Sequence, residues 1–388
     1  MKKHLFPLFL LLLGVNAQAQ QDFFAIAGKE TQSITFNDFR TLDVANGTSG
    51  EKIFTADSSV KVFSQVGRGI VTEDKNSYSN AQAITLAALA YDSANNNLVY
   101  MPMFSSNIYI LNPQTKEITL VENNTARVSS CDINSHITRM ATGYNGNIYA
   151  VNNAGTQFLE ISRKSGQYTV NDLGIIKDDS SNGKNSFTAM ESGFGGDMIA
   201  DTDNNFYVFA ASGNVFKVLT KDLKAKFVGK ITGLPDNYSV NGSAVNALGK
   251  VVIASAKGAA LYEVDLATLE AKQLPGEQGL HIYDLASKYF ANDKASNTNT
   301  LATNLDIYPT KVDEHYINVH GNKNINGNIK LTIFDMSGKS LMTQNLSVKD
   351  ASLDEKVYLK GVLAGAYIVN ITDESGKAIF NKKILVTR

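Results

Sequence analysis

Four aspartates in the middle of the chain are the strongest candidates for chemistry. Asp132, Asp197, Asp201 and Asp284 each lie near a short apolar run that could be an inner strand of a sheet. Carboxylates that converge on one point suit Ca²⁺, and they could equally orient a polar ligand. The competing interpretation is that Asp201 opens an ordinary tight turn. The sequence thus predicts either no cofactor or a calcium ion held by these four carboxylates.

Thiol and imidazole groups are too few to suggest another metal. Cys131 and His136 lie five residues apart, and His281 could approach them through the fold. However, the sequence contains no Cys-x-x-Cys, His-x-His or His-Glu-x-x-His pattern and no Gly-x-Ser-x-Gly nucleophile motif. We therefore interpret Cys131 as a buried thiol, and the histidines as hydrogen-bonded or solvated. We expect stability to come from burial, since one cysteine forms no intramolecular disulfide.

The charge balance excludes one class of partner. Lys plus Arg number 36 and Asp plus Glu number 37, which gives a formal net charge of -1. A protein that binds nucleic acid needs a concentrated basic surface to neutralise phosphates. No nucleic-acid partner is expected.

A repeated pair of strands organises the middle of the chain. Tyr100, Tyr149, Tyr207 and Val252 follow Asn or Gly turns, at successive steps of 49, 58 and 45 residues. Each is followed nine or ten residues later by a second aromatic residue: Tyr109, Phe158, Phe216 and Tyr262. Short runs of β-branched and aromatic residues between polar turns are typical of antiparallel strands. The region from residue 22 to residue 292 is therefore predicted to be nearly all β.

A period of 40 to 50 residues with four strands per unit predicts a β-propeller. We expect six blades, with five or seven as alternatives, and we count residues 42–72 as a degenerate unit. Strands at residues 23–26 and 33–36 would pair with a strand at residues 281–285 and close the ring, which removes exposed sheet edges. An elongated solenoid or a pair of sandwiches is the competing interpretation.

The first residues have the pattern of an export signal. Lys2 and Lys3 precede an apolar stretch, Leu5 to Val15, and then the small-x-small site formed by Ala17 and Ala19. The stretch is shorter than the roughly 20 residues that span a bilayer as a helix. We predict a cleaved signal peptide at residues 1–19, a propeller domain at 20–292 and no transmembrane segment after cleavage.

The end of the chain reads as a second domain. Residues 293–304 are polar and featureless, which indicates a linker. Residues 305–388 contain alternating strands that predict a small antiparallel β-sandwich.

This second domain resembles the type A C-terminal sorting domain of type IX secretion substrates. The matching positions are Tyr308, Pro309, Asp335, Gly338, Gly365, Tyr367, Lys382 and Lys383. Thr310 departs from the family, which usually has Asn-Pro after Tyr-Pro. The resemblance implies a Bacteroidetes-type source and recognition by the outer-membrane secretion machinery. It also implies a final location at the cell surface or outside the cell.

Two functions compete for the propeller. The lack of a catalytic motif favours a non-enzymatic module that binds a surface protein or a glycan, and a purely structural surface protein is hard to separate from it. The alternative is a divalent-cation-dependent hydrolase, because channel carboxylates in a propeller resemble those of the lactonase-like six-bladed hydrolases. Fold alone does not decide between them.

Two further segments of the chain could carry a modification or a binding role. Ser93, between Asp92 and Ala94, resembles the short O-glycosylation acceptor of Bacteroidetes, although a plain turn is the competing interpretation. Residues 178–185 lengthen one repeat and are predicted to project as a loop, a place where binding residues often lie.

Overall fold

The computed structural model describes residues 23–29, 35–44, 46–55, 60–73, 79–83, 85–276, 279–292, 304–322, 328–336, 338–347, 352–372 and 378–387. Within these ranges the chain is all β apart from α1 (Met190–Gly193) and two short 3-10 turns, η1 (Ile133–Ser135) and η2 (Ser180–Asn182). The predicted signal peptide, with Ala17 and Ala19, and most of the predicted linker lie outside the described residues. The prediction of an all-β protein is confirmed.

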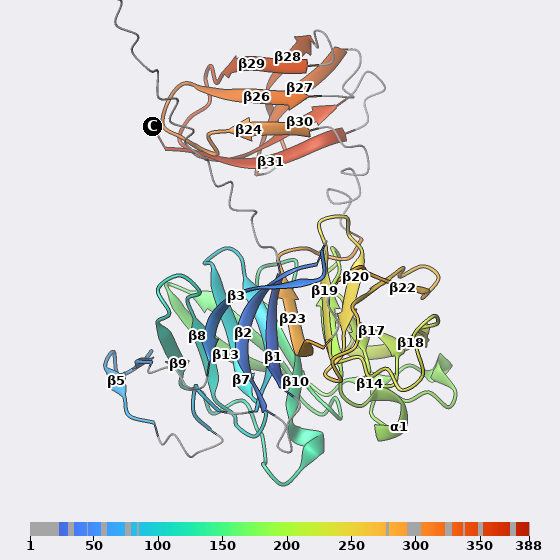
Figure 1. Cartoon of the computed structure of the whole chain (residues 1–388). Helices are drawn as coiled ribbons and strands as arrows, with labels where there is room; N and C mark the ends of the chain where they lie inside the picture. The colour runs from blue at the N-terminus through green and yellow to red at the C-terminus, as the bar shows by residue number, and fades with distance from the viewer. Residues whose placement is uncertain are drawn as a thin grey trace, which may run out of the picture.

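Five mainly antiparallel sheets account for the strands between residues 23 and 292 that the structure describes (Figure 1). The first sheet contains β23 (His281–Ser287), β1 (Phe23–Lys29), β2 (Thr35–Asp43) and β3 (Thr48–Thr55). The second contains β6 (Leu86–Asp92), β7 (Asn97–Pro102), β8 (Ile108–Leu111), β9 (Ile118–Val121), β4 (Val62–Ser64) and β5 (Ile70–Val71). The third contains β10 (Ile137–Thr142), β11 (Ile148–Asn152), β12 (Phe158–Lys164) and β13 (Gln167–Gly174).

The last two sheets follow the same plan. The fourth contains β15 (Asp197–Ala200), β16 (Phe206–Phe209), β17 (Asn214–Leu219), β18 (Lys224–Lys230) and β14 (Lys177–Asp178). The fifth contains β19 (Gly242–Val245), β20 (Val251–Ala254), β21 (Tyr262–Val264) and β22 (Ala271–Gln273). The hairpins predicted from the aromatic repeat join the second and third strands of the last four sheets.

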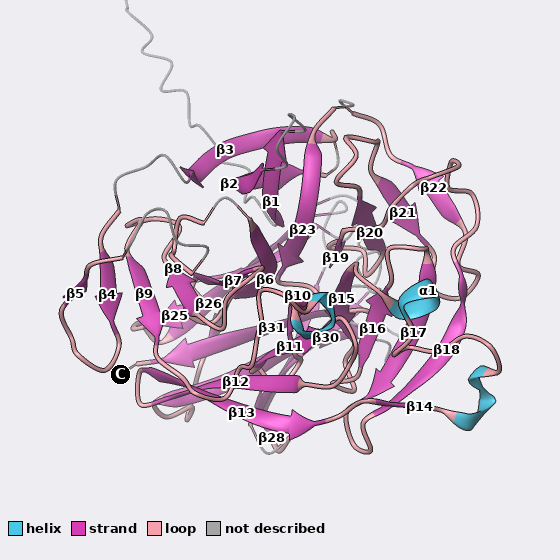
Figure 2. Ribbon diagram, turned by 90° about the horizontal axis from the view of Figure 1, so that it is seen from below, coloured by secondary structure: helices cyan, strands magenta, loops and turns pink. Residues whose placement is uncertain are grey.

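The first strands of the five sheets lie together at the centre of the assembly (Figure 2). In sequence order β6 contacts β10, β10 contacts β15, β15 contacts β19, β19 contacts β23, and β23 returns to contact β6. The apolar core is divided in the same way into five clusters of buried residues, each between two successive sheets. The contacts between sheets are therefore cyclic, and burial between neighbouring sheets supplies most of the hydrophobic stabilisation.

The five sheets are one fewer than the six units that we expected, and they equal the lower of the two alternatives. Residues 42–72 do not form a unit of their own, because β2 and β3 belong to the sheet that β23 and β1 begin. The remaining short strands, β4 and β5, add to the outer edge of the second sheet through parallel pairing of β4 with β9. The strands that we had counted as one separate unit therefore belong to two different sheets, β3 to the first and β4 to the second.

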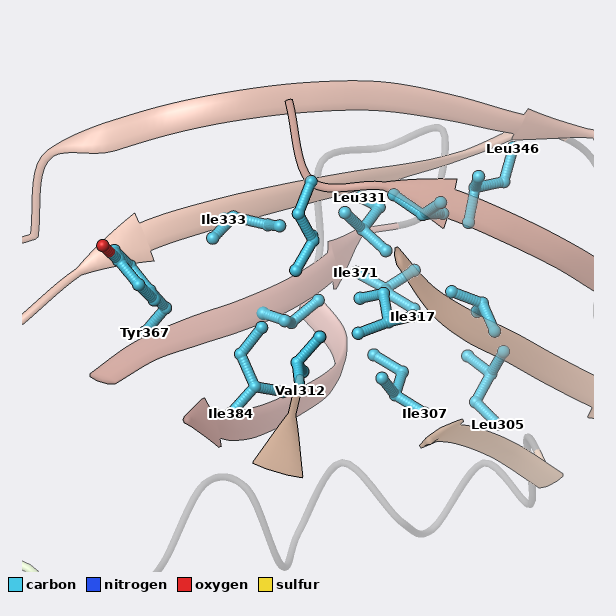
Figure 3. Packing of buried hydrophobic residues seen from close by; sticks show 14 of the residues in the cluster. Leu305, Ile307, Val312, Ile317, Leu331, Ile333, Leu346, Tyr367, Ile371 and Ile384 are labelled. Carbon is cyan, nitrogen blue, oxygen red and sulfur yellow. The ribbon is translucent and has the colours of Figure 1, made fainter. Parts of the chain in front are cut away.

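The C-terminal region is a two-sheet sandwich, as predicted. One sheet contains β24 (Asn304–Tyr308), β26 (Tyr316–Asn322) and β29 (Ser352–Tyr358). The other contains β25 (Lys311–Val312), β31 (Ala378–Val386), β30 (Gly365–Thr372), β27 (Asn328–Asp335) and β28 (Ser340–Ser347). Buried aliphatic residues fill the space between the sheets, as Figure 3 shows for Ile317, Leu331 and Ile384. Strands β24, β25 and β28 were not predicted.

Replacing Ile26 by Ala tests the dependence of the fold on its N-terminal strand. Ile26 in β1 is fully buried with Phe39, Leu89 and Tyr100, so its core joins the first and second sheets. Such a substitution typically costs about 2–5 kcal/mol, which should lower one thermal transition of the full chain by roughly 5–15 °C. Differential scanning calorimetry measures this shift.

The control for this measurement is Val66→Ala, because Val66 is 70% exposed. This variant should unfold within a degree or two of the wild type, since exposed substitutions change stability by about 0.5 kcal/mol or less. Equal transitions for Ile26→Ala and Val66→Ala would contradict the assigned packing.

Candidate binding pocket

A pocket of about 700 Å³ lies at one end of the central strands. Thr138, Gly196 and Tyr283 line it, and each precedes or belongs to the beginning of an innermost strand. All five sheets contribute: the first through Phe36, the second through Leu86, the third through Asn153, the fourth through Ala211 and the fifth through Lys257. The pocket therefore exists only when the five sheets are assembled.

Most of the pocket wall is aromatic or aliphatic. Phe36 and Tyr283 stack with their ring centroids 3.3 Å apart, which joins β2 to β23 at the wall. Phe104 meets the ring of His136 edge-on at 4.9 Å. Leu86, Met103, Ile133 and Phe194 add further apolar surface. The pocket can accept a ligand with a largely apolar body.

The loops after the second strand of each repeat supply much of this wall. Met103, Asn153, Ala211 and Ala256 all follow the second strand of their sheets and line the pocket. Sequence reasoning missed these residues, although their common place in the repeat was a usable signal. Equivalent loops of a cyclic repeat must lie at the same end.

A layer of buried polar residues lies next to the pocket, one position further along the innermost strands. Arg139, Asp197 and Asp284 directly follow the lining residues Thr138, Gly196 and Tyr283, and Ser243 has the corresponding place in β19. All four side chains are at most 1% exposed. Buried polar groups of this kind need partners, and they find many of them in neighbouring sheets.

The hydrogen bonds of this polar layer connect successive sheets. The Asp197 carboxylate accepts one hydrogen bond from the Met198 N–H at 2.7 Å and one from the Ser243 N–H at 2.6 Å. Arg139 donates from Nε to the Gly195 carbonyl at 3.0 Å and from Nη2 to the Gly193 carbonyl. The guanidinium group also lies 5.2 Å from the centre of the Phe187 ring. Arg139 thus links the third sheet to the fourth, and Asp197 links the fourth to the fifth.

Burial changes the acidity of these groups in a consistent direction. It raises the pKa of Asp197, although the backbone N–H groups of Ser243 and Met198 act in the opposite direction. The pKa of Asp284 is raised by burial first and then by the nearby Asp197 carboxylate. Burial lowers the pKa of Arg139 to about 9, and Asp197 partly offsets this effect. The two carboxylates therefore do not ionise independently.

Asp284 is the least satisfied member of the layer. Neither carboxylate oxygen has a hydrogen bond of good geometry among the described residues. The N–H groups of Ala88, Leu89 and Leu285 are nevertheless close enough to lower its pKa against the effect of burial. Ala88 and Leu89 belong to β6, so the Asp284 carboxylate of the first sheet lies near the backbone of the second sheet, as Asp197 of the fourth sheet lies near the fifth.

The structure brings together two of the four predicted aspartates. Asp197 and Asp284 share the buried layer, whereas the exposed Asp132 caps η1 by accepting from the Asn134 N–H at 3.1 Å. Asp201 lies at the far end of β15, where it accepts from the Asn205 N–H at 2.8 Å and pairs with Lys217 at 2.8 Å. In the part of the chain that the structure describes, no group of three or more His, Cys, Asp or Glu residues could hold a metal ion.

Cys131, His136 and His281 lie at or near the pocket, and each has a different environment. Cys131 is exposed and lines the pocket, so the prediction of a buried thiol is wrong. His136 is buried, and its Nε2 atom lies 3.1 Å from the Ser129 carbonyl oxygen. His281 begins β23, and its Nδ1 atom lies 2.6 Å from the carbonyl oxygen of Ala256.

The two local sequence features lie away from the pocket lining. Ser93 is exposed in the turn between β6 and β7, next to the Asp92 carboxylate, which accepts from Asn95 and Tyr168. Residues 178–185 are held against the outer strand of the fourth sheet, where Asn182 donates to the Ala225 carbonyl at 2.9 Å. Asp178 ends β14 at the edge of this sheet, whereas Ser180, Ser181, Gly183 and Lys184 are exposed. A binding role for this segment stays a prediction.

The sorting-domain positions occupy turns and the last strands of the sandwich. Gly338, with φ 85°, completes a turn in which the Asp335 carboxylate accepts from the Lys339 N–H at 3.0 Å. The Tyr367 hydroxyl donates to the Leu363 carbonyl at 2.9 Å and holds the turn before Gly365. Tyr308 is half exposed, and Pro309 follows it at the end of β24. Lys382 and Lys383 lie in β31 opposite β30.

This C-terminal region matches a known family. Residues 306–387 match the secretion system C-terminal sorting domain. The chain is therefore exported by type IX secretion to the cell surface or outside the cell. No helix among the described residues is long and apolar enough to cross a membrane. No curated protein matches the chain.

Several solved structures show distant similarity. A protein of unknown function from Bacteroides thetaiotaomicron is 14% identical, with a TM-score of 0.40, over 70% of this chain and 66% of its own. The extracellular domain of a putative one component system from B. thetaiotaomicron is 9% identical, with a TM-score of 0.35, over 94% of this chain and 49% of its own.

A third similar structure is PorZ of Porphyromonas gingivalis, an essential surface component of the type IX secretion system. PorZ is 12% identical, with a TM-score of 0.28, over 94% of this chain and 51% of its own. The chain spans about half of the length of PorZ and of the one component system domain. The activities of these proteins are not transferred to this chain.

Replacing Asp284 by Asn tests the buried polar layer through the pH dependence of stability. Because the folded protein raises the pKa of Asp284, the ionised carboxylate destabilises it as pH rises above the unfolded value of about 3.9. Asp284→Asn removes this charge, so its melting temperature should exceed that of the wild type at pH 8. The difference should shrink as the pH falls toward 4.

Asp201→Asn is the matched control, since Asp201 is also buried but pairs with Lys217. It should lower the melting temperature at pH 8 because it leaves the ammonium without its partner. A difference between Asp284→Asn and wild type that does not change with pH would contradict the assignment.

Proposed function

We propose that residues 23–292 form a five-bladed β-propeller closed by the pairing of β23 with β1. This propeller acts as a non-enzymatic binding module at the cell surface or outside the cell. Cyclic contact among the five innermost strands supports the blade count. The antiparallel register of β1 with β23, in which Ala25 lies opposite Leu285, supports the closure.

The pocket at the end of the central strands is the observation that carries this function. Its volume of about 700 Å³ lies within the roughly 300–1,000 Å³ typical of ligand sites. It is lined by aromatic and aliphatic residues from all five sheets, with a few polar groups. A small ligand with an apolar body fits this wall, as does a side group exposed on a larger surface molecule.

The chemistry of the lining favours binding over catalysis. The lining residues that the structure describes include no Asp or Glu, and Asp197 and Asp284 are fully buried outside the lining. His136 is held by the Ser129 carbonyl and the Phe104 ring. The calcium-dependent hydrolase stays a prediction, as do a surface protein and a glycan as partners.

The pocket is tested by filling it with a large side chain. Ala211 lines the pocket and is only half-buried, so Ala211→Trp should occupy part of the volume while leaving the sheets intact. A thermal-shift screen of apolar and aromatic small molecules on the full mature chain should yield ligands that stabilise the wild type. At 100 times Kd, such a ligand raises the melting temperature by roughly 5–10 °C. Ala211→Trp should remove this shift.

The control places the same substitution at the opposite end of a sheet. Ala94 is exposed in the turn between β6 and β7, so Ala94→Trp should keep every ligand-induced shift. If ligands stabilise Ala211→Trp as strongly as wild type, or if the whole panel fails to bind wild type, the pocket is not a ligand site.

A further inference from the structure

We propose that the pocket binds an apolar molecule that carries one carboxylate, and that Lys257 receives this carboxylate. The inference rests on the proposed function of the pocket and adds the chemical class of its ligand. It depends on where hydrogen-bond donors remain available around the wall. The fifth sheet supplies one group of such donors. On the side of the third sheet, Thr138 donates to the Asn153 side-chain oxygen and Asn153 donates to the Ile133 carbonyl, and the walls from the first and second sheets are apolar.

The donor side consists of Ser239, Asn241 and Lys257, which lie in the segments before β19 and after β20. These segments are fixed to each other, because the Asn241 side-chain oxygen accepts from the Ala256 N–H at 3.0 Å. The Lys257 ammonium donates to the Asn237 carbonyl at 2.9 Å, and the Lys257 N–H lies 3.2 Å from the Ser255 hydroxyl oxygen. The donors are thus held at one place on the pocket wall.

These three side chains have donor capacity to spare. A lysine ammonium has three N–H groups and no acceptor, and Lys257 uses one of them within the described residues. Asn241 commits its oxygen to Ala256, so the side-chain group left for a ligand is the NH₂. Ser239 adds a hydroxyl. A ligand group made only of acceptors matches this set better than a hydroxyl or an ammonium group.

The charge of the wall points to a single negative charge on the ligand. Lys257 is the one Lys or Arg among the described lining residues, and no acidic residue joins it there. No carboxylate lies within ion-pair distance of its ammonium in the described structure. One lysine balances a carboxylate, whereas a phosphate monoester carries nearly two charges at neutral pH.

Other charges near the pocket do not reverse this preference. Asp132 follows the lining residue Cys131, but it is exposed to solvent and its carboxylate caps η1. In the buried layer, Arg139 lies near Asp197. Burial raises the pKa of both Asp197 and Asp284, and the Asp197 carboxylate raises the pKa of Asp284 further. Burial therefore opposes negative charge in the layer beneath the ligand.

The opposite walls suit the apolar part of the ligand. Phe36, Leu86, Met103 and Phe104 come from the first and second sheets, whereas the donors come from the fifth. Burial of an aromatic or alkyl body there contributes roughly 25 cal/mol for each Å² removed from water. The carboxylate then adds orientation and selectivity rather than most of the affinity.

The test compares two ligands of nearly equal shape, 6-phenylhexanoate and 6-phenylhexanamide, by isothermal titration calorimetry on the full mature chain. Wild type should bind the acid roughly tenfold more tightly than the amide, which is the effect of one charge-assisted hydrogen bond. Lys257→Gln should bind both compounds with nearly the affinity that wild type has for the amide. Lys221→Gln, an exposed lysine in the turn between β17 and β18, should keep the preference.

The outcomes separate the ligand class from the pocket itself. Equal affinities of wild type for the acid and the amide overturn the inference but leave the pocket as a binding site. An unchanged preference for the acid in Lys257→Gln also overturns it, because another group would then receive the carboxylate. If neither compound binds wild type, the inference fails, and the proposed function fails as well only when the whole apolar panel gives no binding.

Discussion

The pairing of β23 with β1 is the constraint on which the arrangement of residues 23–292 depends. Each sheet has two apolar faces, and both must be covered by neighbouring sheets. The five buried clusters lie between successive sheets and include one between the fifth and first and one between the first and second. Without the three N-terminal strands, β23 alone would leave both of those clusters open. Burial along the whole ring therefore depends on contacts between residues about 260 positions apart.

The pocket follows from this cyclic order. When repeated sheets contact one another in cyclic order, their equivalent loops meet at the same end, so side chains from distant segments share one space. The innermost strands bring Arg139, Asp197, Ser243 and Asp284 to one buried layer, where Arg139 and Asp197 bond to the next sheet. A buried polar layer is costly unless its hydrogen bonds are made, and the bonds of Arg139 and Asp197 also join neighbouring sheets beneath the pocket.

The sequence predicted local features well and long-range choices in part. Turn residues and paired aromatics such as Tyr100 and Tyr109 lie within one hairpin, so their spacing identified the strands. The pairing of residues 281–285 with residues 23–26 was also predicted. The place of β3 in that sheet was missed, because local spacing holds no information about which sheet a strand joins. Asp197 begins β15 and Asp201 directly follows it, four residues later. The strand therefore places Asp197 in the buried layer near the pocket and Asp201 in the turn at the other end, and the local sequence does not show which end faces the pocket. The pocket was missed because its lining is mostly apolar and carries no catalytic motif.

Cys131 permits the most direct measurement of the central claim, that this pocket is the binding site of an exported protein. It is the single cysteine of the chain, it is exposed, and it lines the pocket. The rate at which a thiol reagent modifies Cys131 can be followed with and without a saturating ligand from the thermal-shift panel. A bound ligand should slow the reaction severalfold. A rate that stays unchanged while the ligand still stabilises the protein would contradict the account, because the ligand would then bind elsewhere.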